Sequence, residues 1–323
     1  MRSRTAFLLL SVMLFLSAVL VFGISEHNAA TQSSPHLEKP SVIEKETELL
    51  IFEDLEYGKH ENQTLDLNLP VDNREEVGLV VFLHGGGWLD GDKSASKSSY
   101  EVYHANKDYA TASINYRFIN DGKSNVEHII EDITLALEYI KSYAADYSVN
   151  INKVILGGHS AGGHLSLLYA YKHKDISPIE PVGVFTSAPV PDLALELFFT
   201  DNLLGDEQYM CDFISQLCGT TLTPENRASR KAFLDKYSPI NYVSYSTVPT
   251  IVVHGSGDRV APYSGSLKLM KKLRKYRINH ELIVFENTGH SLRGNEDKKQ
   301  YASELMLTCA KTWFGVTEKT NKA

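Results

Sequence analysis

The sequence predicts an α/β fold in which a mostly parallel sheet carries helices on both faces. Strand and helix patterns alternate from residue 48 to residue 315, and such alternation is typical of parallel strands joined by helical crossovers. Residues 78–83 form a continuous apolar run, as expected for a strand that is buried on both faces. No linker rich in Pro, Gly and Ser interrupts this span, so we expect one domain.

Eight segments have the pattern expected of strands. They are residues 49–57, 64–69, 78–83, 109–116, 153–157, 182–186, 250–254 and 281–285. Four further segments are expected to be helices, and in the first of them apolar residues recur with the helical period. They are residues 129–144, 161–171, 264–276 and 298–314.

Composition excludes several classes of protein. The chain has 323 residues, of which 43% are apolar and 22% charged, which suits a globular protein with a sizeable core. With 32 basic and 40 acidic residues the net charge is −8, so no basic field favours nucleic acid as a partner. Three cysteines are too few for a disulfide-rich scaffold.

The first 25 residues predict export. Arg2 and Arg4 precede residues 6–24, a run of 19 residues without a charged side chain. This order is typical of a signal peptide, but the run is also close to the ~20 residues that span a bilayer. We therefore expect a secreted or periplasmic protein, or a domain anchored by one membrane segment outside the cytoplasm. Membrane contact is expected through this segment alone, if it is uncleaved.

The remaining boundaries follow from composition. Residues 26–45 are polar, and we expect them to be a tether. We expect residues 46–315 to be the folded domain and residues 316–323 to be a polar tail. Within the domain, residues 193–236 interrupt the strand and helix rhythm and predict a helical cap. Long excursions from a compact domain are often lids over a functional site, although a packing role far from any site is the alternative.

A short motif predicts a nucleophile. Residues 158–163 read Gly-His-Ser-Ala-Gly-Gly and fit G-x-S-x-G, directly after the apolar residues 154–156 and before the helix 161–171. Glycines permit the tight strand-to-helix turn that exposes the serine hydroxyl. The turn also sets Ser160 at a helix N-terminus, where developing negative charge is favoured.

A glycine loop predicts an oxyanion hole. Residues 84–88 read His-Gly-Gly-Gly-Trp and follow a buried strand. The N–H groups of Gly86 and Gly87, joined by that of Ala161, can bind the oxyanion of a tetrahedral intermediate. A phosphate loop is disfavoured, because neither G-K-[ST] nor G-x-G-x-x-G is present.

Two residues beside these motifs, Trp88 and His159, are candidates for contacting the substrate. Core packing is the alternative for Trp88. His84 is expected to be a structural hydrogen-bonding residue, and His254 to be buried within its strand.

The acid and the base are expected after the serine, in that order. Asp258 follows the strand 250–254 in a glycine-bearing loop, where the acid belongs. Only His280 and His290 come later, and His280 precedes its strand, at the wrong end of the sheet. His290 can therefore take the proton from Ser160 while Asp258 fixes its tautomer. Asp192 and Asp201 are rival acids, but they lie before or at the start of the insertion.

On these residues the chain resembles an α/β-hydrolase of the esterase and lipase group with an HGGG oxyanion loop, which includes hormone-sensitive-lipase-like enzymes. The resemblance implies a mostly parallel central sheet of about eight strands. The glycine loop with Gly91-Asp92-Lys93, together with residues 158–163, is particularly similar to the carbohydrate-esterase-like branch called BD-FAE. Kynurenine formamidases and isoprenylcysteine methylesterases share much of this pattern. Many hormone-sensitive-lipase-like members have Asp where this chain has His159, which favours the carbohydrate-esterase or formamidase side.

The expected function is carboxylic-ester hydrolysis through an acyl enzyme on Ser160, with a small-molecule ester of short to medium acyl chain, or an acylated carbohydrate, as substrate. The alternative is an amide hydrolase, a formamidase or a peptidase, with the same triad. Non-catalytic binding is a third class. No cofactor is expected, and no metal, because no ligand cluster has metal-binding spacing.

Cys211 and Cys218 are candidates for a disulfide in an exported protein. On one continuous helix they would lie about 10.5 Å apart, whereas a disulfide tolerates at most ~7 Å between Cα atoms. A bond therefore requires the helix to break between them, and two free thiols are the alternative.

Overall fold

The computed structural model describes residues 49–70, 76–95, 107–193 and 207–315. The predicted export segment, tether and tail lie outside the described residues, as does part of the predicted cap, residues 194–206. The described residues all belong to one compact unit, residues 40–323.

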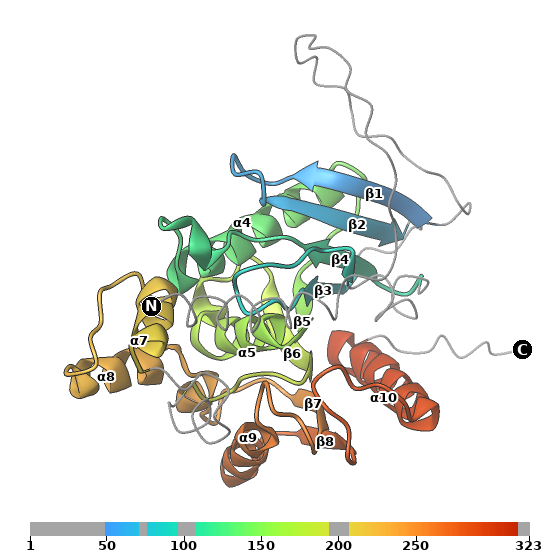
Figure 1. Cartoon of the computed structure of the whole chain (residues 1–323). Helices are drawn as coiled ribbons and strands as arrows, with labels where there is room; N and C mark the ends of the chain where they lie inside the picture. The colour runs from blue at the N-terminus through green and yellow to red at the C-terminus, as the bar shows by residue number, and fades with distance from the viewer. Residues whose placement is uncertain (1–48, 71–75, 96–106, 194–206, 316–323) are drawn as a thin grey trace, which may run out of the picture. The chain divides into compact units, whose positions relative to one another are not determined.

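An eight-stranded sheet forms the centre of the described domain (Figure 1), with the order β1-β2-β4-β3-β5-β6-β7-β8. The strands are β1 (Leu49–Glu56), β2 (Thr64–Pro70), β3 (Leu79–Leu83), β4 (Ala110–Ile114), β5 (Lys153–His159), β6 (Glu180–Ser187), β7 (Thr250–Gly255) and β8 (His280–Phe285). β2 pairs antiparallel with β1 and with β4, and all other neighbours are parallel. The predicted mostly parallel sheet of about eight strands is confirmed.

The parallel strands are apolar because both of their faces are covered. Every residue of β3, β4 and β7 is buried, whereas only Ile283 and Phe285 are buried in β8, at the edge of the sheet. Strands covered on both faces require continuous apolar runs rather than alternating ones, which explains the sequence pattern.

Helices lie on both sides of the sheet, and Figure 1 shows α10 on the opposite side from α4, α5 and α9. The four helices are α4 (Val126–Ala145), α5 (Ala161–Lys172), α9 (Tyr263–Lys275) and α10 (Glu296–Phe314). α10 packs closely through Trp313, whose ring centroid lies 4.9 Å from that of Phe185. A Cβ atom on Gly183 would lie 2.0 Å from the Trp313 ring, so this contact requires glycine on β6.

The insertion between β6 and β7 is helical where it is described. It contains α7 (Glu207–Cys218) and α8 (Arg227–Tyr237). The ring of Phe213 on α7 lies 6.1 Å from Trp88 in the glycine loop, so the insertion packs beside that loop. The short 3-10 helices are η1 (Ile119–Asp121), η2 (Lys174–Ile176) and η3 (Pro239–Tyr242). None of the helices in the described ranges is both long and apolar enough to cross a membrane.

The prediction of a disulfide in the insertion is wrong. Cys211 and Cys218 are both free and buried, and they lie on the single continuous helix α7. Seven residues of α-helix separate the two Cα atoms by about 10.5 Å, which is beyond disulfide geometry. The Cys211 thiol instead accepts a hydrogen bond from Nη1 of the buried Arg230 at 3.2 Å.

One buried histidine ties the glycine loop, α5 and the insertion together. The imidazole of His164 on α5 is fully buried. Its Nδ1 accepts from the indole N–H of Trp88 at 3.3 Å, and its Nε2 donates to the carbonyl oxygen of Tyr237 at 2.8 Å. Both contacts suit a neutral ring, and burial lowers the pKa of His164 from 6.5 to about 4.

The free energy of unfolding should therefore decrease between about pH 6.5 and pH 4. In this window His164 binds a proton in the unfolded chain but not in the folded protein, so acid favours unfolding. This group alone can lower the free energy of unfolding by up to about 3 kcal/mol. His164→Gln keeps a donor for Tyr237 but cannot titrate. Urea unfolding at pH 7.5 and at pH 5 should show the wild type losing more stability than the variant. An equal loss in both proteins would contradict this assignment.

Candidate active site

Ser160 lies in a strained turn between β5 and α5. Its φ angle is 55°, which is the left-handed region and costs a non-glycine residue roughly 1–3 kcal/mol. The turn is fixed on both sides. The Ser160 N–H donates to the carbonyl of Ser187 at 3.0 Å, and the Ser160 carbonyl accepts from the N–H of His164 at 2.9 Å.

The glycines of this turn permit close packing against the end of β3. A Cβ atom on Gly162 would lie 2.0 Å from the carbonyl oxygen of Leu83, and one on Gly158 would lie 2.5 Å from the Gly162 carbonyl carbon. The first turn of α5 therefore lies directly against the start of the glycine loop, which brings the two predicted motifs together.

Asp258 follows β7 and has a fully buried side chain. Its Oδ2 accepts from Nδ1 of His290 at 2.7 Å and from Nε2 of His254 at 3.2 Å. Its Oδ1 accepts from the N–H groups of Val260 and Ala261 at 2.8 and 3.0 Å. Burial alone would raise the pKa of Asp258, but the hydrogen bonds from the two histidines and the charge of His290 outweigh it. The pKa of this carboxyl is therefore held well below its usual range, and the group is ionised at neutral pH.

His254 is a contact of the acid that the sequence analysis missed. The Ser266 hydroxyl lies 2.8 Å from Nδ1 of His254, and the Ala261 carbonyl lies 2.8 Å from Nε2. Because a carbonyl can only accept, Nε2 carries the proton and points it toward Ala261 and Asp258. The spacing of four residues between His254 and Asp258 across the end of β7 is the one sequence signal for this contact.

His290 lies in the loop after β8, as predicted. Its Nδ1–H is used by Asp258, so Nε2 is left as the basic nitrogen, and the side chain is 19% exposed. The loop is joined to the acid loop, where the Gly257 N–H donates to the Thr288 carbonyl at 3.0 Å. It also contacts the nucleophile turn, since Nε2 of His159 lies 3.1 Å from the His290 carbonyl oxygen.

The ring of His159, which precedes Ser160 in the turn, lies beside His290. Its ring centroid lies 4.7 Å from that of His290, and its Nδ1 would lie 3.0 Å from a Cβ atom on Gly85. Burial, and then the charge of His290, lower the pKa of His159 to about 4. His159 is therefore a neutral donor to the base loop. Its predicted contact with substrate stays a prediction.

The glycine loop lies beside the nucleophile. A Cβ atom on Gly85 would lie 3.4 Å from Cβ of Ser160, and the φ angles of Gly86 and Gly87 are 109° and 63°. In the described loops, no backbone hydrogen bond uses the N–H of Gly86, Gly87 or Ala161. These three N–H groups are thus free of backbone partners there, and their predicted role as oxyanion donors stays a prediction.

His84 and Trp88 support this loop from the interior. The His84 ring stacks on Tyr116 with centroids 4.2 Å apart, and its Nδ1 lies 2.7 Å from the Gly85 carbonyl. Trp88 is 3% exposed and donates to His164. The structure thus places Trp88 in the core, and its predicted contact with substrate is untested.

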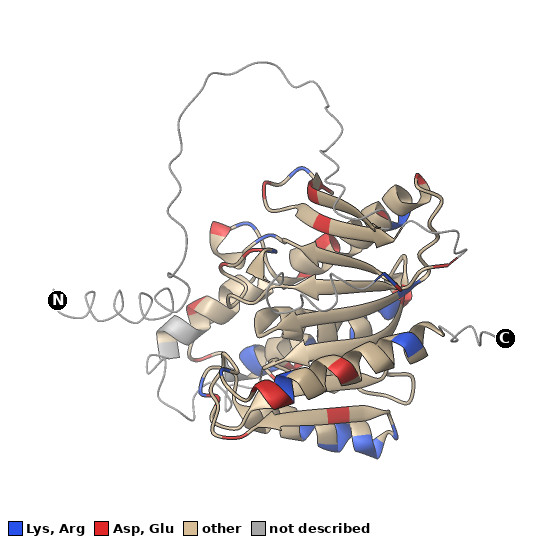
Figure 2. Ribbon diagram, turned by 90° about the vertical axis from the view of Figure 1, so that its right-hand side faces the viewer, with Lys and Arg blue, Asp and Glu red and all other residues tan. Residues whose placement is uncertain are grey.

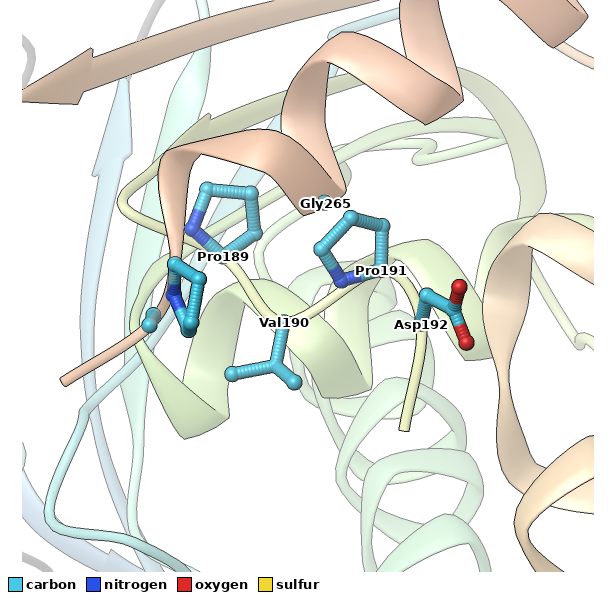
Figure 3. Close-up of a pocket in the computed structure, with 7 residues that line it drawn as sticks. Pro189, Val190, Pro191, Asp192 and Gly265 are labelled. Atoms are coloured by element: carbon cyan, nitrogen blue, oxygen red, sulfur yellow. The ribbon is translucent and has the colours of Figure 1, made fainter. Parts of the chain in front are cut away.

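Of the rival acids, Asp192 pairs with Lys268 at 3.4 Å rather than with His290, and Asp201 lies outside the described residues. Asp192 instead lines a shallow recess between the loop after β6 and the start of α9 (Figure 3). The recess is lined by Pro189, Val190, Pro191, Asp192, Ala261, Pro262 and Gly265. It adjoins the acid loop, because the Ala261 N–H donates to Asp258.

The described ranges contain no group of three or more His, Cys, Asp or Glu side chains that could hold a metal ion. The site instead contains Ser160 in its strained turn, the hydrogen-bonded pair of His290 and Asp258, and the glycine loop beside the turn. This arrangement can perform nucleophilic acyl transfer.

Residues 65–273 match the family model BD-FAE. The chain belongs to the BD-FAE family. The match contains Ser160, Asp258 and the glycine loop, and ends before His290. The predicted resemblance to α/β-hydrolase esterases is confirmed.

Curated relatives have esterase names. The chain is 24% identical over 231 residues to the probable carboxylic ester hydrolase LipM of Mycobacterium tuberculosis, covering 71% of this chain and 52% of that protein. It is 29% identical over 267 residues to a probable isoprenylcysteine alpha-carbonyl methylesterase of Arabidopsis thaliana, covering 75% and 59%. The chain thus spans only about half to three-fifths of these relatives.

Solved structures confirm the fold. Esterase B from Lactobacillus rhamnosis superposes with a TM-score of 0.65 at 18% identity, covering 85% of this chain and 89% of that one. A truncated carbohydrate esterase from gut microbiota gives 0.66 at 18% identity, covering 85% and 100%. The α/β-hydrolase fold predicted from the motifs is the fold of this domain.

Gly162→Ala should destabilise the protein, because the new methyl group would collide with a backbone carbonyl that cannot move aside. Overpacking of this kind lowers the free energy of unfolding by roughly 1–3 kcal/mol. Gly289→Ala is the matched control, since a Cβ atom there meets nothing within 4 Å. Urea unfolding should separate the two variants. Equal stability of both would show that the turn tolerates a side chain.

Asp258→Asn should lower kcat for ester hydrolysis by roughly 10³–10⁴-fold, because an amide no longer holds His290 in the required tautomer. Asp192→Asn, in the rival acid, should leave kcat within about 3-fold, because Asp192 pairs with Lys268 and not with His290. Steady-state kinetics on a short aryl ester measure both. The assignment of the acid fails if Asp192→Asn is the more damaging change.

Proposed function

We propose that this chain is a serine carboxylic-ester hydrolase that forms an acyl enzyme on Ser160. The observation that carries the proposal is the hydrogen bond of 2.7 Å between His290 Nδ1 and the buried carboxylate of Asp258. This bond leaves Nε2 of His290 as a base at the edge of the turn that presents Ser160. The esterase names of the relatives support the same reaction class.

In the proposed reaction, Ser160 Oγ attacks the ester carbonyl carbon while His290 Nε2 takes the hydroxyl proton. The carbonyl π electrons move to oxygen, and the resulting oxyanion accepts hydrogen bonds from Gly86, Gly87 and Ala161. Collapse breaks the bond to the alcohol oxygen, which receives the proton from His290. Water then repeats the sequence on the acyl enzyme, releasing the acid and restoring Ser160.

The charges of the site suit this sequence. Asp258 stays ionised because four donors surround its carboxylate, and so it stabilises the imidazolium of His290. His159, whose pKa is lowered to about 4, stays neutral at neutral pH and adds no second positive charge beside His290.

We further propose short to medium acyl esters as substrates, with acylated carbohydrates among them. The names of the relatives, a carboxylic ester hydrolase and a methylesterase, support small esters as the substrate class. Amide hydrolysis by the same triad remains the second candidate. Export of the enzyme is also a proposal, and it depends on residues 1–25.

A fluorophosphonate probe and an acyl-chain panel test the proposal. Wild-type protein should be labelled, and Ser160→Ala should lose labelling and at least about 10⁴-fold in kcat. Turnover of aryl esters should be highest for the shorter chains between acetyl and decanoyl.

Acetylated and feruloylated sugars, N-formylkynurenine and aminoacyl amides complete the panel. Faster turnover of an amide than of any ester would replace the proposal with the second candidate. Labelling that persists in Ser160→Ala would refute the assignment of Ser160 as the nucleophile. A wild-type protein that is not labelled would leave only a non-catalytic binding function.

A further inference from the structure

Helix α9 has a basic outer face on an otherwise acidic protein. Residues 263–277 contain no Asp or Glu, and their six cations are Lys268, Lys271, Lys272, Arg274, Lys275 and Arg277, which we call the α9 basic face. Since the whole chain has a net charge of −8, the rest of it carries −8 − 6 = −14. In Figure 2 the α9 ribbon at the lower edge carries blue segments and no red one.

The amphipathic pattern of α9 fixes which way these charges point. Leu269, Met270 and Leu273 are buried against the sheet, which turns Lys271 and Lys275 outward. Within the described residues, Lys268 is the one cation of this face that is paired with a carboxylate, Asp192 at 3.4 Å. Burial, and then the charge of Lys275, lower the pKa of Lys272, while the charge of Asp192 acts in the opposite direction.

Exposed apolar and aromatic groups adjoin the charges. Leu267, one turn before Lys271, is 47% exposed, and Tyr245 is 79% exposed. The Tyr245 ring packs edge-on against Tyr276 at the end of α9, with centroids 5.0 Å apart. Tyrosine rings settle at the headgroup level of bilayers, whereas a dissolved polyanion offers no apolar layer for such groups. Basic residues with interleaved apolar ones are typical of surfaces that bind membranes.

We propose that the α9 basic face, with Leu267 and Tyr245, docks this domain on an anionic phospholipid surface. Charge complementarity to lipid phosphates supplies the attraction. The uncharged run 6–24 is consistent with this partner, since the 24 residues between it and β1 reach at most ~80 Å when fully extended. The proposal does not depend on the hydrolase activity.

Lysine acetylation of the full-length chain gives a direct test. Vesicles with equal parts phosphatidylglycerol and phosphatidylcholine should protect Lys271 and Lys275 from acetic anhydride, and pure phosphatidylcholine vesicles should not. The exposed Lys59, Lys123 and Lys299 should react equally in both. Because insertion of residues 6–24 would occur in both vesicles, the difference reports on α9. Equal protection in both vesicles, or none, would overturn the proposal.

Charge removal gives an independent measurement. The triple variant Lys271→Gln, Arg274→Gln and Lys275→Gln should lower the ratio of the partition coefficients onto anionic and onto pure phosphatidylcholine vesicles by roughly 100-fold. Its kcat should not change. Raising the salt concentration from about 0.1 M to about 1 M should also weaken binding of the wild type to anionic vesicles, because salt screens the attraction between the charges.

The matched control removes three cations elsewhere, by Lys59→Gln, Lys123→Gln and Lys299→Gln. It has the same net charge as the first variant and should bind anionic vesicles nearly as wild type does. Equal losses in the two variants would refute a local surface. Binding of the α9 basic face to soluble heparin but not to vesicles would also refute the proposal. It would indicate a soluble polyanion as the partner.

Discussion

The active site depends on one steric constraint, the approach of the Leu83 carbonyl oxygen to the first turn of α5. No side chain fits at Gly162, where a Cβ atom would lie 2.0 Å from that oxygen. This closeness lets α5 begin directly at Ser160 and brings the end of β3 beside it. The glycine loop leaves β3 at the same place, so one contact positions both the proposed nucleophile and the proposed oxyanion donors.

The other half of the site is held by hydrogen bonds rather than by close packing. The loops after β7 and β8 are joined through Gly257 and Thr288, and the carboxylate of Asp258 receives two imidazole and two backbone donors. Because each oxygen of this carboxylate accepts hydrogen bonds from two donors, the group cannot rotate without losing some of them. The orientation of His290 is thus set by a rigid partner on one side and by His159 on the other.

The sequence predicted the parts of this structure that local patterns encode. Continuous apolar runs located the buried strands, and the glycine motifs located the strained turn at Ser160 and the loop beside it, because tight turns admit few residue types. His254 was not predicted as a partner of Asp258, since only the folded loop 255–261 brings its Nε2 to that carboxylate.

The disulfide prediction failed for a similar reason. The spacing of Cys211 and Cys218 allowed a bond only if the helix broke between them, and the sequence contains no local signal that decides this. The packing of Phe213 beside Trp88 likewise depends on contacts between segments far apart in the chain, which a local pattern does not contain.

The position of β8 has a consequence for how the enzyme would fail on heating. β8 is the edge strand of the described sheet, paired with β7 alone, and only two of its six residues are buried, yet the loop that follows it carries His290. Edge elements open locally at a lower free energy than the centre of a sheet. Heat inactivation would therefore begin with detachment of the base while the nucleophile turn, in the middle of the sheet, is still intact.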